Sequence, residues 1–207
     1  MTTMIKRRSF TTLSAGIVLG SVAELYPQEE KPNPPPVIAG PAEGPFERNY
    51  PAPGFKPSWK KLQINRQLVQ DFVIFAHSDL AMVKQLAERE PGLVNASIDW
   101  GGGDWESGLG GASHMGRKDI VEYLLGKGAR MDLFCAAMMG QLEAVKSFLT
   151  LQPLLIDAKG PHGFSLHFHA QVGGKDAEKV LAYLQSVKKM ELKPNPFLKK
   201  SPTPNKK

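Results

Sequence analysis

The chain has a single cysteine, Cys135, among its 207 residues, so no disulfide bond can form within it. It also lacks the GxxxxGK[ST] phosphate loop, a GxGxxG turn after a strand and the GxSxG elbow of serine hydrolases. No CxxC or HExxH metal-binding motif is present. These absences lead us to expect neither a catalytic residue nor a cofactor.

What the sequence does contain is a pattern that recurs three times. Each copy begins at a small residue and carries apolar residues five and eight positions later, which places both on one face of a helix. The small residues are Ser78, Gly116 and Gly140, and the apolar pairs are Val83 with Leu86, Val121 with Leu124, and Val145 with Phe148. Repeated units of this kind bury their apolar faces by stacking on their neighbours.

The second copy shows a specific resemblance. Residues 107–116 and their continuation 120–129 agree at about ten positions with the pattern TPLHxAAxxGHxxVVxxLLxxGA, and so resemble the ankyrin repeat. The copy beginning at Leu133 follows after only 24 residues, which predicts that it lacks the hairpin that normally joins such units. A weaker fourth copy runs from Gly163 to Leu184, and the first copy has no TPLH segment.

The resemblance implies an all-α fold, an ankyrin-repeat α-solenoid of about four repeats. We expect the repeat domain to cover residues 59–187, while composition separates from it a signal peptide (1–23), a proline-rich linker (24–58) and a disordered tail rich in lysine and proline (188–207). We expect helices near residues 66–77, 79–90, 107–115, 117–127, 133–139, 141–151, 165–172 and 176–187.

The first 23 residues resemble a twin-arginine export signal. The basic group Lys6, Arg7 and Arg8 precedes an apolar run of about ten residues, which is shorter than the about 20 that a membrane span needs. Small residues at Ser21 and Ala23 suit a signal peptidase, so we expect cleavage after Ala23 and a periplasmic location. A charged, disordered start on a cytosolic protein stays open as the alternative.

The net charge of +6 comes from the two ends of the chain. Three positive charges lie in the first 23 residues, and residues 188–207 carry seven lysines and Glu191, which leaves 24–187 at about −3. We therefore expect no nucleic-acid partner, a solvated tail that could contact an anionic surface weakly, and a monomer.

Cysteine and histidine chemistry receives little support from the sequence. Cys135 lies in an apolar segment, where a lone cysteine behaves as a packed hydrophobic residue, and His114 is the one obvious base for it. The expected helix over 165–172 turns His167 and His169 away from each other by about 200 degrees. We therefore predict no metal site at His162, His167 and His169.

The most unusual segment is residues 99–106, which carries three glycines, two tryptophans and three acidic residues. One interpretation is a loop that binds a partner at the concave face of the repeats; the other is that the tryptophans pack over the edge of the domain. A glycosidase built from Asp99, Asp104 and Glu106 would lack the opposed scaffold that this chemistry needs. The residues that we expect to contact an unidentified protein partner are Trp100, Asp104, Trp105, Glu106, His114, Met115, Phe134 and Met138.

A second hypothesis belongs to another class. A ligand-binding protein or enzyme of the periplasm would use the loop of Trp100 and Trp105 together with His114 and His162.

Overall fold

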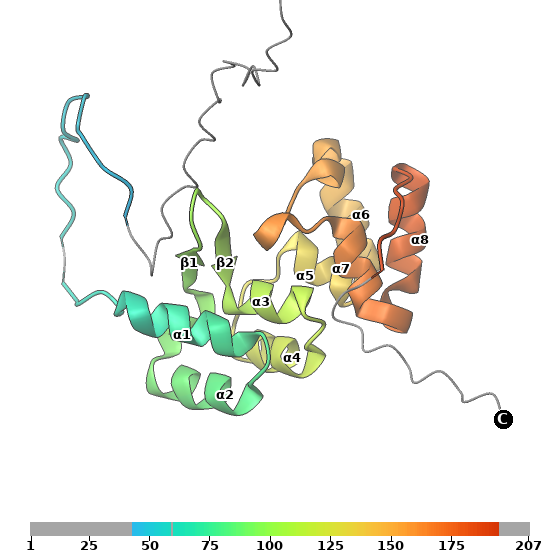
Figure 1. The fold of residues 1–207 in the computed structure, drawn as a ribbon, viewed down its shortest axis with the longest axis horizontal. Coiled ribbons are helices and arrows are strands. Elements are labelled where there is room, and N and C mark those ends of the chain that lie inside the picture. Colours follow the sequence, from blue (N-terminus) through green and yellow to red (C-terminus); the bar gives the residue numbers. More distant parts are fainter. Residues whose placement is uncertain (1–42, 59, 195–207) are drawn as a thin grey trace, which may run out of the picture. The chain divides into compact units, whose positions relative to one another are not determined.

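The computed structural model describes residues 43–58 and 60–194, and most of these residues are helical (Figure 1). The expected signal peptide, most of the expected linker and the last 13 residues of the expected tail lie outside this part of the chain. Residues 43–58 contain no helix or strand. The helices are α1 (Arg66–Ala76), α2 (Leu80–Arg89), α3 (Gly108–His114), α4 (Lys118–Gly126), α5 (Leu133–Met138), α6 (Leu142–Leu151), α7 (Leu166–Gly173) and α8 (Glu178–Val187).

Short elements connect these helices. One antiparallel hairpin, formed by β1 (Ser97–Asp99) and β2 (Trp105–Ser107), pairs Ile98 with Glu106. Four 3-10 turns accompany it: η1 (Pro91–Asn95), η2 (Pro153–Asp157), η3 (Pro161–Gly163) and η4 (Gly174–Ala177). Among the described residues, the connection between α4 and α5 contains no strand, as the short spacing of that copy predicts.

Side-chain caps explain where the odd-numbered helices start. An oxygen at the residue before each of them accepts a hydrogen bond from a backbone N–H of the first turn. These residues are Asn65, Ser107, Asp132 and Ser165. Asp79 caps α2 in the same way. Before α4 and α6 the chain turns instead at Gly116 (φ 68°) and Gly140 (φ 72°), a backbone conformation that glycine adopts without strain.

The helices contact one another in a regular order (Figure 1). Each of α1, α3 and α5 contacts the next odd-numbered helix, while α2 contacts α4 and α6 contacts α8. Each odd-numbered helix also packs against the even-numbered helix that follows it. No helix of the described residues combines the length and apolarity that crossing a bilayer requires.

The repeated pattern fills the core. Val83, Val121 and Val145 are completely buried, as expected, and Leu124 and Leu86 are buried with them. Two apolar clusters result, one mainly from α1 to α4 and one from α5 to α8. α5 joins them, because Cys135 and Met138 belong to the first cluster while Leu133, Ala136 and Ala137 belong to the second.

Two expectations about packing need correction. Phe148 does not lie in the core, because its side chain is 39% exposed. Leu149, four residues after Val145, is buried in its place, since it lies on the same face of α6 as Val145. The tail is also ordered further than expected. Gln171 of α7 donates to the Lys193 carbonyl, and Gln185 of α8 bonds both backbone groups of Met190, so residues 188–194 lie against the last two helices.

Candidate functional site

The β1–β2 hairpin separates two environments within three residues. Side chains alternate along a strand, so Trp105 is 63% exposed while the neighbouring Glu106 is 1% exposed. The turn between the strands is fixed by Asp99, whose Oδ1 accepts hydrogen bonds from Gly101 N at 2.8 Å and Gly103 N at 3.0 Å. The hairpin therefore presents an aromatic ring outward and a carboxylate inward.

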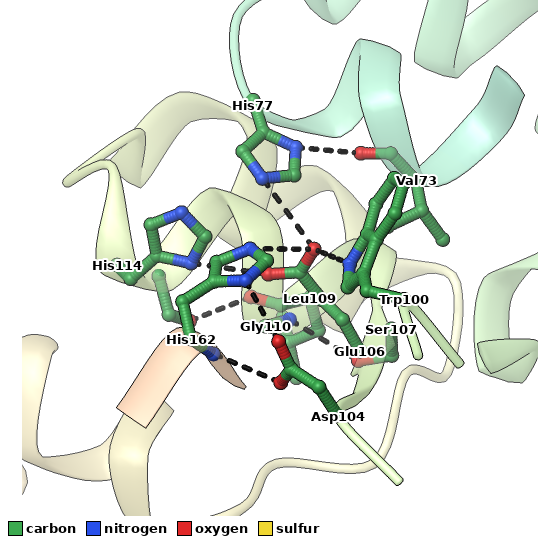
Figure 2. Close-up of polar contacts among 11 residues, drawn as sticks. Val73, His77, Trp100, Asp104, Glu106, Ser107, Leu109, Gly110, His114 and His162 are labelled. Atoms are coloured by element: carbon green, nitrogen blue, oxygen red, sulfur yellow. Dashed lines mark hydrogen bonds and ion pairs between the residues drawn. The ribbon is translucent and has the colours of Figure 1, made fainter. Parts of the chain in front are cut away.

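Glu106 is the centre of a polar cluster in the interior (Figure 2). Trp100 Nε1 donates to Glu106 Oε2 at 2.7 Å, and His114 Nδ1 lies 3.1 Å from Oε1. Burial by itself raises the pKa of Glu106, but the contacts with His114, His77 and Trp100 together outweigh burial and hold that pKa below its ordinary value. The carboxylate is therefore ionised although it has almost no contact with solvent.

Two further histidines face the same carboxylate. Nε2 of His77 and Nε2 of His162 each lie 3.5 Å from Glu106 Oε2. The second nitrogen of each ring contacts another oxygen. His77 Nδ1 lies 2.8 Å from the Val73 carbonyl oxygen, and His162 Nδ1 lies 3.0 Å from Asp104 Oδ2. Figure 2 shows the three imidazole rings around Glu106, with Val73 and Asp104 on their outer sides.

The backbone at His162 is unusual. Its φ of 56° makes it the one non-glycine residue with a positive φ in the described ranges 43–58 and 60–194. Asp104 stabilises this conformation, because its Oδ1 accepts a hydrogen bond from His162 N at 2.9 Å while Oδ2 contacts the ring. Strained residues of this kind concentrate at functional sites.

The cluster has a buried floor and a rim that solvent reaches. The side chains of Glu106 and His114 are 0% and 3% exposed, whereas those of His77 and His162 are 23% and 35% exposed. An open depression of about 390 Å³ lies over the rim, lined by Ile74, His77, Ser78, Trp100 and His162. One potential ligand atom from each of His77, Glu106, His114 and His162 lies within 4.8 Å of the others, so these residues could hold a metal ion.

A polar groove lies on the outer side of the hairpin. It has a volume of about 370 Å³ and is bordered by the hairpin, the starts of α3 and α5, and η3. Asp104, Trp105 and Phe134, three of the residues that we expected to contact a partner, line this groove. Trp100 is 37% exposed and points to the other depression, and Met115 is half-buried at the end of α3.

The remaining expected partner residues lie in the interior. Glu106, His114 and Met138 are at most 2% exposed, so a macromolecule cannot contact them on this conformation of the surface. Glu106 is buried because side chains alternate between the two faces of β2. Met138 is buried because other helices pack against α5. The predicted contact surface is thus reduced to Trp100, Asp104, Trp105, Met115 and Phe134.

Cys135, His167 and His169 are packed as the sequence suggested. Burial raises the pKa of the Cys135 thiol to about 11, so the thiol stays protonated near neutral pH. His167 and His169 lie on α7 and make separate contacts, with the Lys188 and Ser165 carbonyl oxygens respectively. His162 joins neither of them, because it lies before α7 and faces the hairpin.

The residue that sequence reasoning missed is His77. It immediately precedes the small residue Ser78, and so occupies the same position in its copy as Met115 and Met139 do in theirs. Since Met115 was expected at the contact surface, the repeat register could have placed His77 beside the hairpin as well.

No family model matches the chain, and no curated protein compared with it matches either.

Proposed function

We propose that residues 66–187 form an ankyrin-type α-solenoid of about four units, and that this domain recognises a protein partner without catalysis. Support comes from the succession of helix pairs, in which each odd-numbered helix contacts the next. The proposed unit has its hairpin before α3 and lacks one before α5. The export signal proposed for residues 1–23 would place this recognition in the periplasm.

The observation that carries this proposal is the groove beside the hairpin. Trp105 and Phe134 offer aromatic surface to it, and Asp104 and Lys159 supply charges of both signs. Exposed tryptophan next to polar groups is typical of the residues that dominate protein interfaces. An extended segment of a partner protein, with a few side chains in the groove, is the occupant that we propose.

Pull-down from a periplasmic extract tests this function. The full chain should retain one stoichiometric protein, and Trp105→Ala should lose it. The matched control is Leu154→Ala, which removes an 87% exposed apolar side chain from η2, away from the groove. Loss of the partner by both variants, or by neither, would contradict the assignment of this groove.

A small-ligand site at the loop of Trp100 and Trp105 is the second candidate function. The observation in its favour is that His114 and His162 contact Glu106, to which Trp100 also donates, next to an open depression. A ligand in this depression would contact Trp100 and the rim histidines but not Trp105, which lies on the groove side. Trp100→Phe should therefore weaken the binding of such a ligand, whereas Trp105→Ala should leave it unchanged.

A further inference from the structure

We propose that His77, Glu106, His114 and His162 form a binding site for one divalent transition-metal ion with the ligand preferences of zinc. This site is separate from the groove proposed for a protein partner. The two share Asp104 but no metal ligand, so either proposal can fail without the other.

The orientation of the rings is the first argument. A carbonyl oxygen only accepts hydrogen bonds, so the His77 nitrogen that faces Val73 carries a proton. Asp104 Oδ2 lies 3.0 Å from the corresponding nitrogen of His162. In both rings this leaves the second nitrogen, Nε2, pointing at Glu106.

The buried carboxylate needs a positive charge beside it. Glu106 is 1% exposed, and both Nε2 atoms lie 3.5 Å from its Oε2, which is longer than a good hydrogen bond. One metal ion between these atoms would supply the charge and bind the rings in the neutral form that metal-bound histidines have.

The spacing suits zinc. In a tetrahedral site with bonds of about 2.0 to 2.1 Å, neighbouring ligand atoms are about 3.3 Å apart. His114 Nδ1 lies 3.1 Å from Glu106 Oε1, and His77 Nε2 and His162 Nε2 each lie 3.5 Å from Oε2. One ligand atom from each of the four residues lies within 4.8 Å of the others, so the side chains would move closer together when they bind one ion.

A second layer of contacts orients the ligands. Metal-bound histidines usually donate their other N–H to a carbonyl or a carboxylate, which sets the ring orientation and makes the ligand more basic. Val73 plays this role for His77 and Asp104 plays it for His162, while Trp100 donates to Glu106.

The ligand set selects the class of ion. Three imidazole nitrogens and one carboxylate favour zinc and neighbouring transition metals over calcium and magnesium, which prefer oxygen ligands only. Because the depression at the rim reaches His77 and His162, water or a small anion could occupy a further position on the ion.

Metal titration tests the site directly. The full chain, produced without a histidine tag and stripped with a chelator, should bind one equivalent of Zn²⁺ in competition with a chromophoric chelator. Co²⁺ should bind at the same site and give the visible absorption of a four- or five-coordinate ion. His162→Ala and Glu106→Gln should each lower the affinity more than about 100-fold, since each removes a ligand.

Two variants test the supporting contacts without changing a ligand. Asp104→Asn should lower affinity about 10- to 100-fold. Gly111→Ala should also lower it, because a Cβ at this position would lie 2.8 Å from the His77 ring and displace it. The matched control is His167→Gln, which removes an imidazole outside the cluster and should bind Zn²⁺ like the parent chain.

Three results would overturn the proposal. One is absence of stoichiometric Zn²⁺ and Co²⁺ binding by the chelator-treated chain. Another is unchanged affinity in His162→Ala, whose half-exposed side chain can be removed without repacking the core. Equal loss in His167→Gln and His162→Ala would also contradict it, because the binding would then depend on folding and not on these ligands.

Discussion

Histidine is usually only partly buried, but His167 and His169 of α7 are at most 1% exposed. His169 Nδ1 lies 2.9 Å from the Ser165 carbonyl oxygen and therefore donates to it. Burial lowers the pKa of His169 to about 4; the bond to Ser165 opposes this, and His114 adds slightly to it. The ring is thus neutral at every pH where the protein is expected to work.

This pKa makes a prediction about stability and pH. In the unfolded chain an imidazole binds a proton near pH 6.5, while folded His169 binds one only near pH 4. The free energy of unfolding should therefore fall as the pH drops from about 6.5 to about 4, with a contribution from His169 of up to about 3 kcal/mol. Urea unfolding across this pH range measures the effect.

His169→Asn is the matched variant for that experiment. Its amide can still donate to Ser165 but does not titrate, so the difference in pH dependence between the two proteins isolates His169. Identical pH dependence in both proteins would show that folding does not change the pKa of His169.

At the same scale, the sequence allowed only part of the site to be predicted. Trp105 was expected at a contact surface because it lies in the glycine-rich segment 99–106, and it is exposed. Glu106 was expected there too, but the alternation of side chains along β2 buries it, and the direction of that alternation depends on what the hairpin packs against. His77 was missed because its copy diverges most from the repeated pattern.

At the scale of elements, all eight expected helices are present, and no end differs from its expected position by more than two residues. Local signals account for this agreement. Apolar spacing defines each helix, and capping side chains or turn glycines mark the starts. The prediction that Phe148 is buried was wrong. Positions three and four residues after Val145 are nearly equivalent on a helix, so only contacts with the neighbouring helices decide whether Phe148 or Leu149 is buried.

Replacing a core leucine should lower the free energy of unfolding more than replacing an exposed one. Leu124→Ala should lower the free energy of unfolding by about 2 to 5 kcal/mol, because Leu124 is completely buried in the first apolar cluster. Leu151→Ala is the control: Leu151 is 80% exposed, so its loss should change stability by less than about 0.5 kcal/mol. Chemical unfolding of both variants measures the difference, and equal effects would contradict the assigned core.

The contact between α5 and α7 depends on a glycine. A Cβ at Gly173 would lie 2.1 Å from the Met138 carbonyl oxygen, a backbone atom that cannot move without its helix. Gly173→Ala should therefore destabilise the fold by about 1 to 3 kcal/mol or more, despite the better helix propensity of alanine.

Gly126→Ala serves as the control for Gly173→Ala. Gly126 ends α4, and nothing lies within 4 Å of a Cβ built there, so the variant should be neutral or slightly more stable. Thermal unfolding compares the pair. A Gly173→Ala protein as stable as Gly126→Ala would show that α5 and α7 do not approach this closely.

At the scale of the whole molecule, the cluster around Glu106 draws its side chains from four segments between residues 77 and 162. Helical periodicity predicts each segment but not which of them meet. The sequence therefore indicated helices and an unusual loop, whereas the meeting of three histidines depends on tertiary packing. His162 also needs a left-handed backbone that no local motif around it predicts.

Export is the prediction that concerns the whole chain. Changing Arg7 and Arg8 together to lysine should keep most of the protein, at full length, in the cytoplasmic fraction, because the paired arginines define this type of signal. The parent chain and a Lys31→Arg control should appear in the periplasm as a shorter product. Cell fractionation with an antibody measures this, and a cytoplasmic parent chain would contradict the signal.

The short connection between α4 and α5 has a consequence for residues far from it. It contains no strand, and the polar groove near its end is bordered by the β1–β2 hairpin, the start of α5 and η3. Because this connection is only a short loop, it leaves room for η3 to bring His162 to Asp104 of the hairpin. Lengthening this loop to the size of an ordinary hairpin would preserve every helix yet separate one imidazole from the other two.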